Sequence, residues 1–266
     1  MVLASQFEYN NQMSDDWNLI LCKFDDDGID ETSNGLDLSP ITDELVNKDI
    51  DYGAKNDSKL SFDITLVHKT DSTKMFTRGE IRELSRWLLT PDIHWLKLYD
   101  EEYDDYWALG RFLSISKTTM EGKIPAVTVT FESVYSYYYS DVIRRSFTVD
   151  GSSSVEIIAN GDELEGYMYP DMTIKNLSGD TVTIQNSLDS MPFSLSGLEK
   201  GETITIDGQN LILYSDKATS SLGFKIFGDM FNRHWLKFFR GTNTLKMTGS
   251  FQVTFEYREA RRIGEF

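Results

Sequence analysis

The chain has 266 residues, of which 40% are hydrophobic and 13% aromatic, so it can bury one large hydrophobic core or two ordinary ones. Its formal net charge is −17, from 26 Lys and Arg against 43 Asp and Glu. A chain this acidic is not expected to bind nucleic acid through phosphates, because such binding needs clustered Lys and Arg. The acids gather in the first half. Residues 1–140 hold 13 basic and 26 acidic residues, a net of −13, and residues 141–266 hold 13 and 17, a net of −4.

Cys22 is the only cysteine, so no intrachain disulfide can form, which is typical of a reducing compartment. It lies in an apolar stretch with no histidine near it and is predicted to be a small buried hydrophobe. Residues 1–6 contain no basic residue, so we expect no signal peptide. No stretch approaches the roughly 20 apolar residues of a membrane span, so no membrane association is expected.

Short strands are predicted at residues 7–10 and 17–24, and a stretch of different composition follows. Residues 25–58 contain few apolar residues and many Asp, Asn, Ser and Gly, so they are predicted to form a long acidic excursion from the core. Such an excursion usually has a function or a partner. A calcium loop starting at Asp25 would need Gly at the position of Asp30. The pattern therefore does not predict a metal, although it leaves one open.

A strand and a helix are predicted next. Residues 60–68 alternate, with Leu60, Phe62, Ile64 and Leu66 inward and His68 at the surface. Residues 77–90 are predicted to form an amphipathic helix. Its start is a capping box, in which Thr77 and Glu80 satisfy each other's backbone N–H groups. Ile81, Leu84 and Leu88 form its apolar stripe, with Trp87 beside them, and Pro91 ends it.

A β-hairpin is predicted after the helix. Residues 95–99 and 106–115 alternate in polarity, and the acidic residues 100–105 between them are expected to form a solvated turn. The helix must bury its stripe on a sheet, and this hairpin is the nearest one. Residues 126–132 form another predicted strand, with Val127, Val129 and Phe131 inward.

The tyrosine-rich residues 134–140 precede a domain boundary predicted near residue 145. They are interpreted as inter-domain packing, with a sugar-stacking platform as the alternative. The second half contains many short alternating strands separated by turn residues, which predicts a β-sandwich or jelly roll. The predicted strands are 154–158, 172–177, 181–186, 202–207, 211–214, 235–238, 243–247 and 251–257. Residues 224–231 are left open as strand or loop.

Motifs for catalysis are missing from the sequence. There is no Gly-x-Ser-x-Gly elbow and no phosphate-binding Gly-rich loop. His68, His94 and His234 are far apart and lack metal-ligand spacing. We therefore predict no enzyme, no catalytic residue, no cofactor and no metal ligand, and the binding residues stay unknown. The pair His234-Trp235 could serve a sugar site, but Trp235 is predicted to pack in the core.

Four segments in order resemble the distal tail protein family of siphophages (Dit, the Sipho-tail group). The first is the opening strand FEYN at 7–10, ahead of Trp17. The second is the helix RGEIRELSRWL at 78–88, followed by KLYD at 97–100 and YWA at 106–108. The third is VTFES at 129–133 with YYY at 137–139. The fourth is ITIDG at 204–208, then RGTNTL at 240–245 and FEYR at 255–258.

The resemblance implies a mainly β protein with two domains. An N-terminal ring-forming domain, residues 1–144, would contain a barrel-like sheet, the packed helix 77–90 and the excursion 25–58. A C-terminal galectin-like β-sandwich (jelly roll), residues 145–257, would lie outside the ring, and residues 258–266 would return to the N-terminal domain.

As a function, the resemblance implies a structural virion protein at the tail tip, made in the host cytoplasm. It would form a homo-hexameric ring, the baseplate hub, which joins the tail tube protein to the tail-tip protein and can hold receptor-binding proteins. DNA would only pass through the lumen. The rival interpretation is a carbohydrate-binding module that contacts host cell-wall glycan, and a glycoside hydrolase ranks third.

Overall fold

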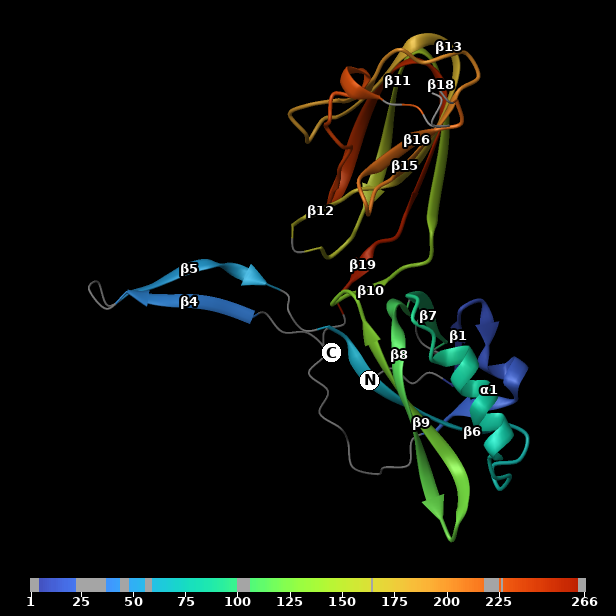
Figure 1. The fold of residues 1–266 in the computed structure, drawn as a ribbon. Coiled ribbons are helices and arrows are strands. Elements are labelled where there is room, and N and C mark those ends of the chain that lie inside the picture. The colour runs from blue at the N-terminus through green and yellow to red at the C-terminus, as the bar shows by residue number, and fades with distance from the viewer. Residues whose placement is uncertain are drawn as a thin grey trace. The chain divides into compact units, whose positions relative to one another are not determined.

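The protein is described from a computed structural model, which covers residues 5–22, 37–43, 48–55, 59–99, 106–163, 165–217, 225 and 227–262. The chain divides into two compact units (Figure 1). The N-terminal unit is Met1–Tyr139 with Arg261–Phe266, and the C-terminal unit is Ser140–Ala260. Both consist mainly of antiparallel strands, so the predicted fold class is confirmed.

The N-terminal unit is built on one antiparallel sheet with the order β2-β1-β7-β8-β9-β6-β3. Its strands are β1 (Gln6–Tyr9), β2 (Gln12–Met13), β3 (Leu19–Leu21), β6 (Ser61–His68), β7 (His94–Tyr99), β8 (Tyr106–Met120) and β9 (Lys123–Ser133), with the short β10 (Tyr138–Tyr139) and β19 (Ala260–Arg261) off this path. The Leu21 N–H donates to the Ser5 carbonyl at 3.2 Å. The two ends of the sheet therefore approach each other, but the sheet does not close into a barrel.

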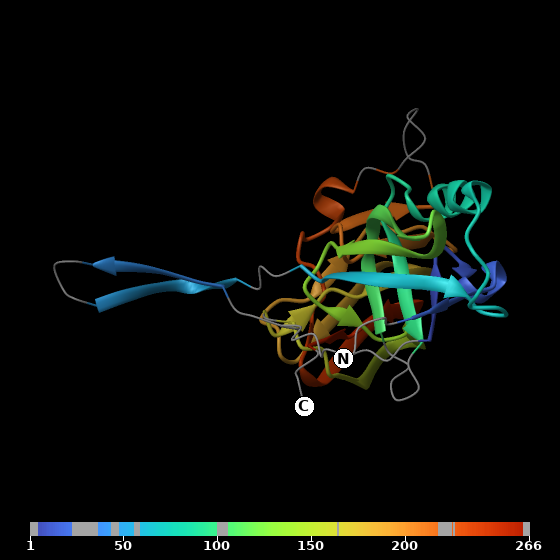
Figure 2. The ribbon, with the colours of Figure 1, turned by 90° about the horizontal axis from the view of Figure 1, so that it is seen from below.

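Helix α1 (Arg78–Leu88) packs on this sheet (Figure 2). The predicted capping box is present: the Glu80 N–H donates to the Thr77 hydroxyl at 3.2 Å, and the Thr77 N–H donates to the Glu80 carboxylate at 2.8 Å. The predicted stripe of Ile81, Leu84 and Leu88 is buried. The apolar face of the helix therefore lies in the core, as its pattern predicts.

Trp87 connects the helix to the first strand and to the turn that follows it. Its indole ring lies between Phe7 and Trp17, at centroid distances of 5.5 and 5.1 Å and within 8° of parallel. Its Nε1–H donates to the Tyr9 carbonyl at 3.1 Å. A 3-10 turn (Ser14–Trp17) brings Trp17 to this position.

The hairpin prediction is confirmed, because β7 pairs with β8 in a register that sets Lys97 opposite Trp107. The inward positions Val127, Val129 and Phe131 of β9 are fully buried, as predicted. Cys22, predicted as buried, is only half-buried. The acidic turn at 100–105 lies outside the described residues.

The excursion contains a two-stranded ribbon, β4 (Asp37–Asp43) and β5 (Lys48–Lys55). Among the described residues these strands pair only with each other. The calcium-like residues Asp25 to Glu31 lie outside the described part of the chain.

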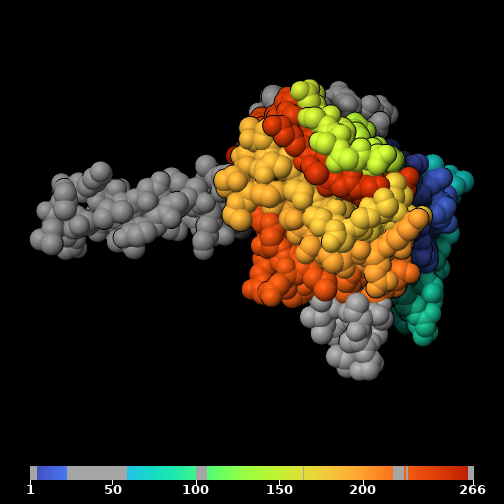
Figure 3. Space-filling model, turned by 90° about the horizontal axis from the view of Figure 1, so that it is seen from above, coloured from blue at the N-terminus to red at the C-terminus, as the bar shows by residue number. Residues whose placement is uncertain are grey.

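The C-terminal unit has a six-stranded sheet with the order β11-β18-β13-β15-β16 and β14 paired to β13. Strand β11 (Ile143–Ala159) pairs with β18 (Gly241–Tyr257) along its full length, and Figure 3 shows the two side by side in yellow-green and red. The other strands are β13 (Asp171–Asn186), β14 (Phe193–Leu195), β15 (Thr203–Asp207) and β16 (Ile212–Ser215), with a separate ribbon of β12 (Tyr167–Met168) and β17 (Phe238–Phe239).

Two pairs of predicted strands are single strands in the structure. Residues 172–177 and 181–186 both belong to β13, and residues 243–247 and 251–257 both belong to β18. The prediction was wrong because glycines at 179 and 249 were interpreted as turns. Gly249 instead pairs with Gly151, and its φ of 134° lets the two long strands continue through the middle of the sheet.

Smaller differences occur near the end of this unit. Of the predicted strand 235–238, only Phe238 lies in a strand, and the open region 224–231 contains a 3-10 turn at Gly228–Met230. The largest fully buried side chains in the apolar core of this unit are Phe193, Phe238, Phe251 and Phe255.

Candidate interaction surfaces

The three histidines predicted to be isolated lie in three unrelated places. His68 was predicted at the surface, and this is wrong: its side chain is 4% exposed and stacks on Phe76 at 4.4 Å. Burial, helped by the nearby Lys74, lowers the pKa of His68 below its usual value. His94 meets the edge of Tyr9 at 5.4 Å. Among the described residues, no three His, Cys, Asp or Glu side chains are grouped to hold a metal ion.

An aromatic cluster lies on the N-terminal sheet, on the alternating positions that do not face the core. Trp95 meets Trp107 at 6.3 Å and Tyr139 at 5.6 Å, both nearly perpendicular. The Lys97 ammonium lies 5.2 Å from the Trp107 ring centroid. Strand alternation explains this placement, because Leu96 and Leu98 on the same strand are buried.

The tyrosines of residues 134–140 do not form the flat platform that the sugar alternative needs. Tyr138 is buried in the core, Tyr135 meets Tyr139 edge-on at 6.1 Å, and Tyr137 lies under Arg262. Their rings serve packing within the N-terminal unit. Whether they also pack between domains stays a prediction.

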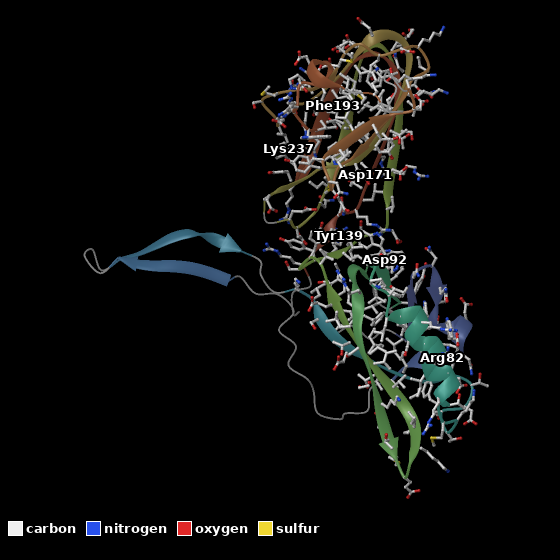
Figure 4. The ribbon with its side chains drawn as sticks, in the orientation of Figure 1. Arg82, Asp92, Tyr139, Asp171, Phe193 and Lys237 are labelled. Carbon is white, nitrogen blue, oxygen red and sulfur yellow. The ribbon has the colours of Figure 1, made fainter. Side chains whose placement is uncertain are left out.

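The outward side of α1 carries a row of cations. Arg78, Arg82 and Arg86 are all exposed and follow one another at four-residue spacing, so they lie along one side of the helix. Figure 4 labels Arg82 on the helix. Arg86 pairs with Glu83 at 3.0 Å. Within the described residues, Arg78 and Arg82 take part in no ion pair.

A second mixed cluster lies beside the β12–β17 ribbon of the C-terminal unit. Tyr167 contacts Tyr169 and Phe239 at ring-centroid distances of 5.5 and 5.8 Å, and the Lys237 ammonium lies 4.6 Å from the Tyr167 ring centroid. Lys237 is labelled in Figure 4. Burial raises the pKa of Tyr169, and its hydrogen bond with Tyr167 acts in the same direction. These half-buried rings combine apolar faces with polar tips.

His234 and Trp235, named from the sequence as a sugar-site pair, have separate contacts. His234 Nε2 lies 2.9 Å from a carboxylate oxygen of Asp189. Trp235 packs against the core and meets Phe231 at 4.9 Å, so the prediction of core packing is confirmed.

Sequence reasoning missed one buried ion pair. Lys225 Nζ lies 2.7 and 2.9 Å from the two oxygens of Glu202, and the side chains are 1% and 0% exposed. The partners are 23 residues apart with no pattern between them, so no local signal could have paired them. This pair is sealed in the C-terminal unit and is structural.

Solved structures of phage tail and baseplate proteins have the same fold as this chain. The crystal structure of the SPP1 Dit protein, described as a paradigm of the hub adsorption apparatus in phages that infect Gram-positive bacteria, matches at a TM-score of 0.65. It is 11% identical, and the match covers 95% of this chain and 98% of that one. Two structures of the phage p2 baseplate in its activated conformation, with Ca and with Sr, match at TM-scores of 0.55 and 0.53. They have 10% and 9% identity and cover 99% and 95% of this chain and 100% and 97% of theirs.

The chain belongs to a phage tail protein family. The family's N-terminal domain matches residues 3–133, and its C-terminal domain matches residues 137–257. The resemblance to distal tail proteins is thereby confirmed: the family is a phage tail protein family, and the fold is that of the SPP1 Dit protein. No curated protein matches the sequence significantly. In the described residues, no helix has the length and apolar character needed to cross a membrane.

Proposed function

We propose that this protein is a non-enzymatic ring subunit at the distal end of a phage tail. In this proposal the N-terminal domain, residues 1–144, associates with copies of itself into a hexamer, the baseplate hub. The ring joins the tail tube protein to the tail-tip protein. The galectin-like C-terminal domain, residues 145–257, lies outside the ring and holds receptor-binding proteins, and residues 258–266 return to the N-terminal domain.

The observation that carries this proposal is the length of the match to SPP1 Dit. Both units take part in it, since it covers 95% of this chain and 98% of that one. Two further observations agree. The half-buried Trp95–Trp107 cluster and the exposed arginines of α1 lie on the N-terminal unit, where a ring interface is expected, and among the described residues no three His, Cys, Asp or Glu side chains are grouped to hold a metal ion.

Electron microscopy of the purified full-length protein tests the ring directly. We expect a six-fold annulus and a solution mass of six times the 30.5 kDa chain. A permanent ring interface buries on the order of 2,000 Å² or more, so the ring should survive dilution to micromolar concentrations. A protein that stays monomeric at tens of micromolar, alone and with its tail-tip partner, would contradict the proposal.

The charge of the N-terminal half suits a DNA passage. Residues 1–140 carry a net charge of −13, which would repel DNA phosphates if these acids line the lumen. DNA would then pass without binding. The charge lining of a solved ring decides this point, and a neutral or basic lumen would contradict it.

Carbohydrate binding by the C-terminal unit is the second candidate, and the Tyr167–Tyr169–Lys237 cluster favours it. Sugar sites combine aromatic faces with convergent polar groups, and Asp189 and His234 lie nearby. Glycan-array binding by the full-length protein, lost in Tyr169→Ala and kept in the control Tyr214→Ala, would support it. Tyr214 is 55% exposed in the same unit, so it controls for the loss of a surface tyrosine. Absence of glycan binding would remove this candidate.

A further inference from the structure

Strand β11 (Ile143–Ala159) is an open sheet edge of unusual length. It pairs with β18 over all 17 of its residues, and within the described chain no strand pairs with its other side. Figure 3 shows β11 in yellow-green with β18 in red along one side. The other strands that end the two large sheets are short, because β2 has 2 residues, β3 has 3 and β16 has 4. Proteins usually blunt a long open edge, since its unpaired backbone groups recruit further strands.

Several features that close an edge to pairing are missing from β11. Its sequence, IRRSFTVDGSSSVEIIA, contains no proline and no lysine, and its inward positions after Arg145 carry no charge. Its register with β18 runs without a shift from one end to the other. Gly151 has a φ of 83° in the middle of the strand, but its pairing with Gly249 keeps the ladder intact. The edge is therefore open to an added strand.

Hydrogen bonds of the neighbouring strands show which backbone groups of β11 point outward. Asn176 on β13 directs both its N–H and its C=O away from β18, to the residues before β15. Its partner Phe251 therefore directs its own N–H and C=O to the other side, where Val149 of β11 lies opposite. The Thr244 carbonyl bonds on the β13 side, so its partner Glu156 points outward. Odd-numbered residues of β11 thus bond to β18, and even-numbered ones present N–H and C=O at the open edge.

The inward face of β11 leaves apolar surface for a further strand to cover. Ile143, Phe147 and Val155 pack against the core of the C-terminal unit but are only partly buried. Inward side chains of β18, such as Phe251 and Phe255, are fully buried, because β18 has a strand on each side. A strand added beside β11 would give its inward side chains the same cover.

The charge at the start of β11 indicates the chemistry of such a strand. The Arg145 guanidinium donates to the outward Arg144 carbonyl at 3.2 Å, so it lies at the open edge. Arg144 is paired with Glu256 at 2.8 Å, whereas Arg145 is exposed and forms no ion pair with a described residue. A carboxylate on the added strand would meet Arg145 there. The expected partner is an extended segment with apolar residues at alternate positions and an acidic residue at one end.

We propose that an extended segment of another virion protein adds to β11 as the next strand of the C-terminal sheet. This inference rests on the proposed function, in which the C-terminal unit holds receptor-binding proteins, and it assigns the place and the mode of that contact. A second copy of this chain does not fit the same role within one ring. Two β11 edges meet about a two-fold axis, and a ring with only a six-fold axis passing through it has none between neighbours.

Proline at outward positions tests the backbone contact. Thr148→Pro with Ser154→Pro removes two outward N–H groups and places proline rings there, while the ladder to β18 keeps its donors. The probe is the purified receptor-binding protein of the same phage, and biolayer interferometry against the full-length chain measures its Kd. The variant should bind at least about tenfold more weakly, because two backbone hydrogen bonds are lost and the rings block the added strand.

The matched control is Thr148→Ala with Ser154→Ala, which removes the same exposed side chains and keeps both N–H groups. It should bind as the unchanged chain does. Arg145→Gln should weaken binding about threefold and make it less dependent on salt, because it removes a charge at the edge of the contact.

Hydrogen exchange of the unchanged chain decides the question even if the proline variant does not fold. In the free protein the even-numbered amides of β11 should exchange fast, and the odd-numbered ones should be protected by β18. Binding of the receptor-binding protein should slow the even-numbered amides at least about tenfold.

The outcomes separate this inference from the proposed function. If the receptor-binding protein binds but the proline variant binds equally well, or the even-numbered amides stay unprotected, the inference is overturned and the proposed function stands. If the alanine variant loses as much binding as the proline variant, side chains carry the recognition and strand addition is wrong. If mass photometry shows pairs of rings that only the proline variant abolishes, the occupant is a second copy, and the inference is again wrong.

Two results bear on the proposed function first. If rings form but bind no receptor-binding protein, the adaptor part of the proposed function falls and this contact with it. If the unchanged chain stays monomeric yet gains protection on β11 when the receptor-binding protein binds, the ring falls and the strand contact stands.

Discussion

Replacing Lys225 by Met should destabilise the C-terminal unit strongly, because it leaves a buried carboxylate without its cation. Glu202 accepts hydrogen bonds from Lys225, from the Ser215 hydroxyl at 2.6 Å and from the Glu199 N–H at 2.7 Å. Lys225 also donates to the Gly197 carbonyl at 3.0 Å. Every group in this small network therefore has a partner, and removing the cation leaves the fully buried carboxylate without a compensating charge.

The expected cost of Lys225→Met is about 3–5 kcal/mol, the usual cost of breaking a buried pair from one side. The double variant Lys225→Met with Glu202→Gln should cost at least about 2 kcal/mol less than the sum of the two single changes. In the double variant the neutral amide oxygen introduced by Glu202→Gln can still accept the hydrogen bond from Ser215 or from the Glu199 N–H, and no buried charge is left unpaired. Hydrogen exchange of the β15 amides measures the free energy of unfolding of this unit without requiring the two units to unfold together.

The pH dependence of this site has a defined sign. Burial alone would raise the pKa of Glu202, but its hydrogen bonds from Lys225, Ser215 and Glu199 lower it below the usual value. The network therefore stabilises the fold above the unfolded-state pKa of about 4.3, and this contribution is lost as the pH falls through the lowered folded-state pKa. A loss below about 1 kcal/mol in Lys225→Met, or additive single changes, would refute this account of the pair.

Three further predictions concern other positions. Hydrogen bonds from Lys74 and the Thr77 N–H lower the pKa of Glu80 from 4.5 to about 2, so the ionised Glu80 stabilises the fold above pH 4.5, and this stabilisation is lost between pH 4.5 and about 2. Glu80→Gln should remove this part of the fall in stability with acid, by less than about 1 kcal/mol at this half-exposed site, and acid unfolding measures it. His68→Phe should raise stability by about 1 kcal/mol, because both ring nitrogens are buried without a hydrogen-bond partner among the described residues. Since the lowered pKa keeps His68 neutral in the fold, the variant should also lose the decrease in stability that begins below about pH 6.5, and urea unfolding at pH 7.5 and 5.5 measures both effects. Gly249→Ala should lower the melting temperature, because a Cβ there would lie 2.7 Å from the Thr181 carbonyl at a φ of 134°. Gly122→Ala, at a φ of 75° with nothing within 4 Å, controls for the backbone strain of a positive φ, and a melting temperature lowered no more by Gly249→Ala than by this control would contradict the close approach.

Local signals in the sequence predicted the local structure well. The Thr77–Glu80 capping box, the stripe ending at Leu88 and the alternation in β7, β8 and β9 each depend on residues a few positions apart, and each is present. The burial of His68 was missed because its neighbour Phe76 arrives from a following loop, which alternation within the strand cannot reveal.

Long-range pairing explains most of the remaining misses. Residues 178–180 and 248–250 have turn composition, but the β11–β18 ladder runs unbroken past 248–250, and β13 continues past 178–180 with register shifts in its pairing to β18. The contact of Trp87 with Phe7 and Trp17 joins residues 80 and 70 positions apart. The Glu202–Lys225 pair depends on two segments that meet only in the folded unit. Such contacts follow from the topology, and a single sequence does not encode them in any local pattern.

The distribution of charge links the fold to the proposed assembly. Both cores are apolar, and the acids are concentrated along the sequence in residues 25–58, which contain 11 acidic residues and 2 lysines and have a net charge of −9. Copies of such a chain repel one another at long range, but at 0.15 M salt this repulsion is screened beyond about 8 Å. Contacts between opposite charges act at 3–4 Å and are screened much less. If the proposed ring forms, its strongly acidic subunits can therefore associate through short-range contacts although they repel one another at long range.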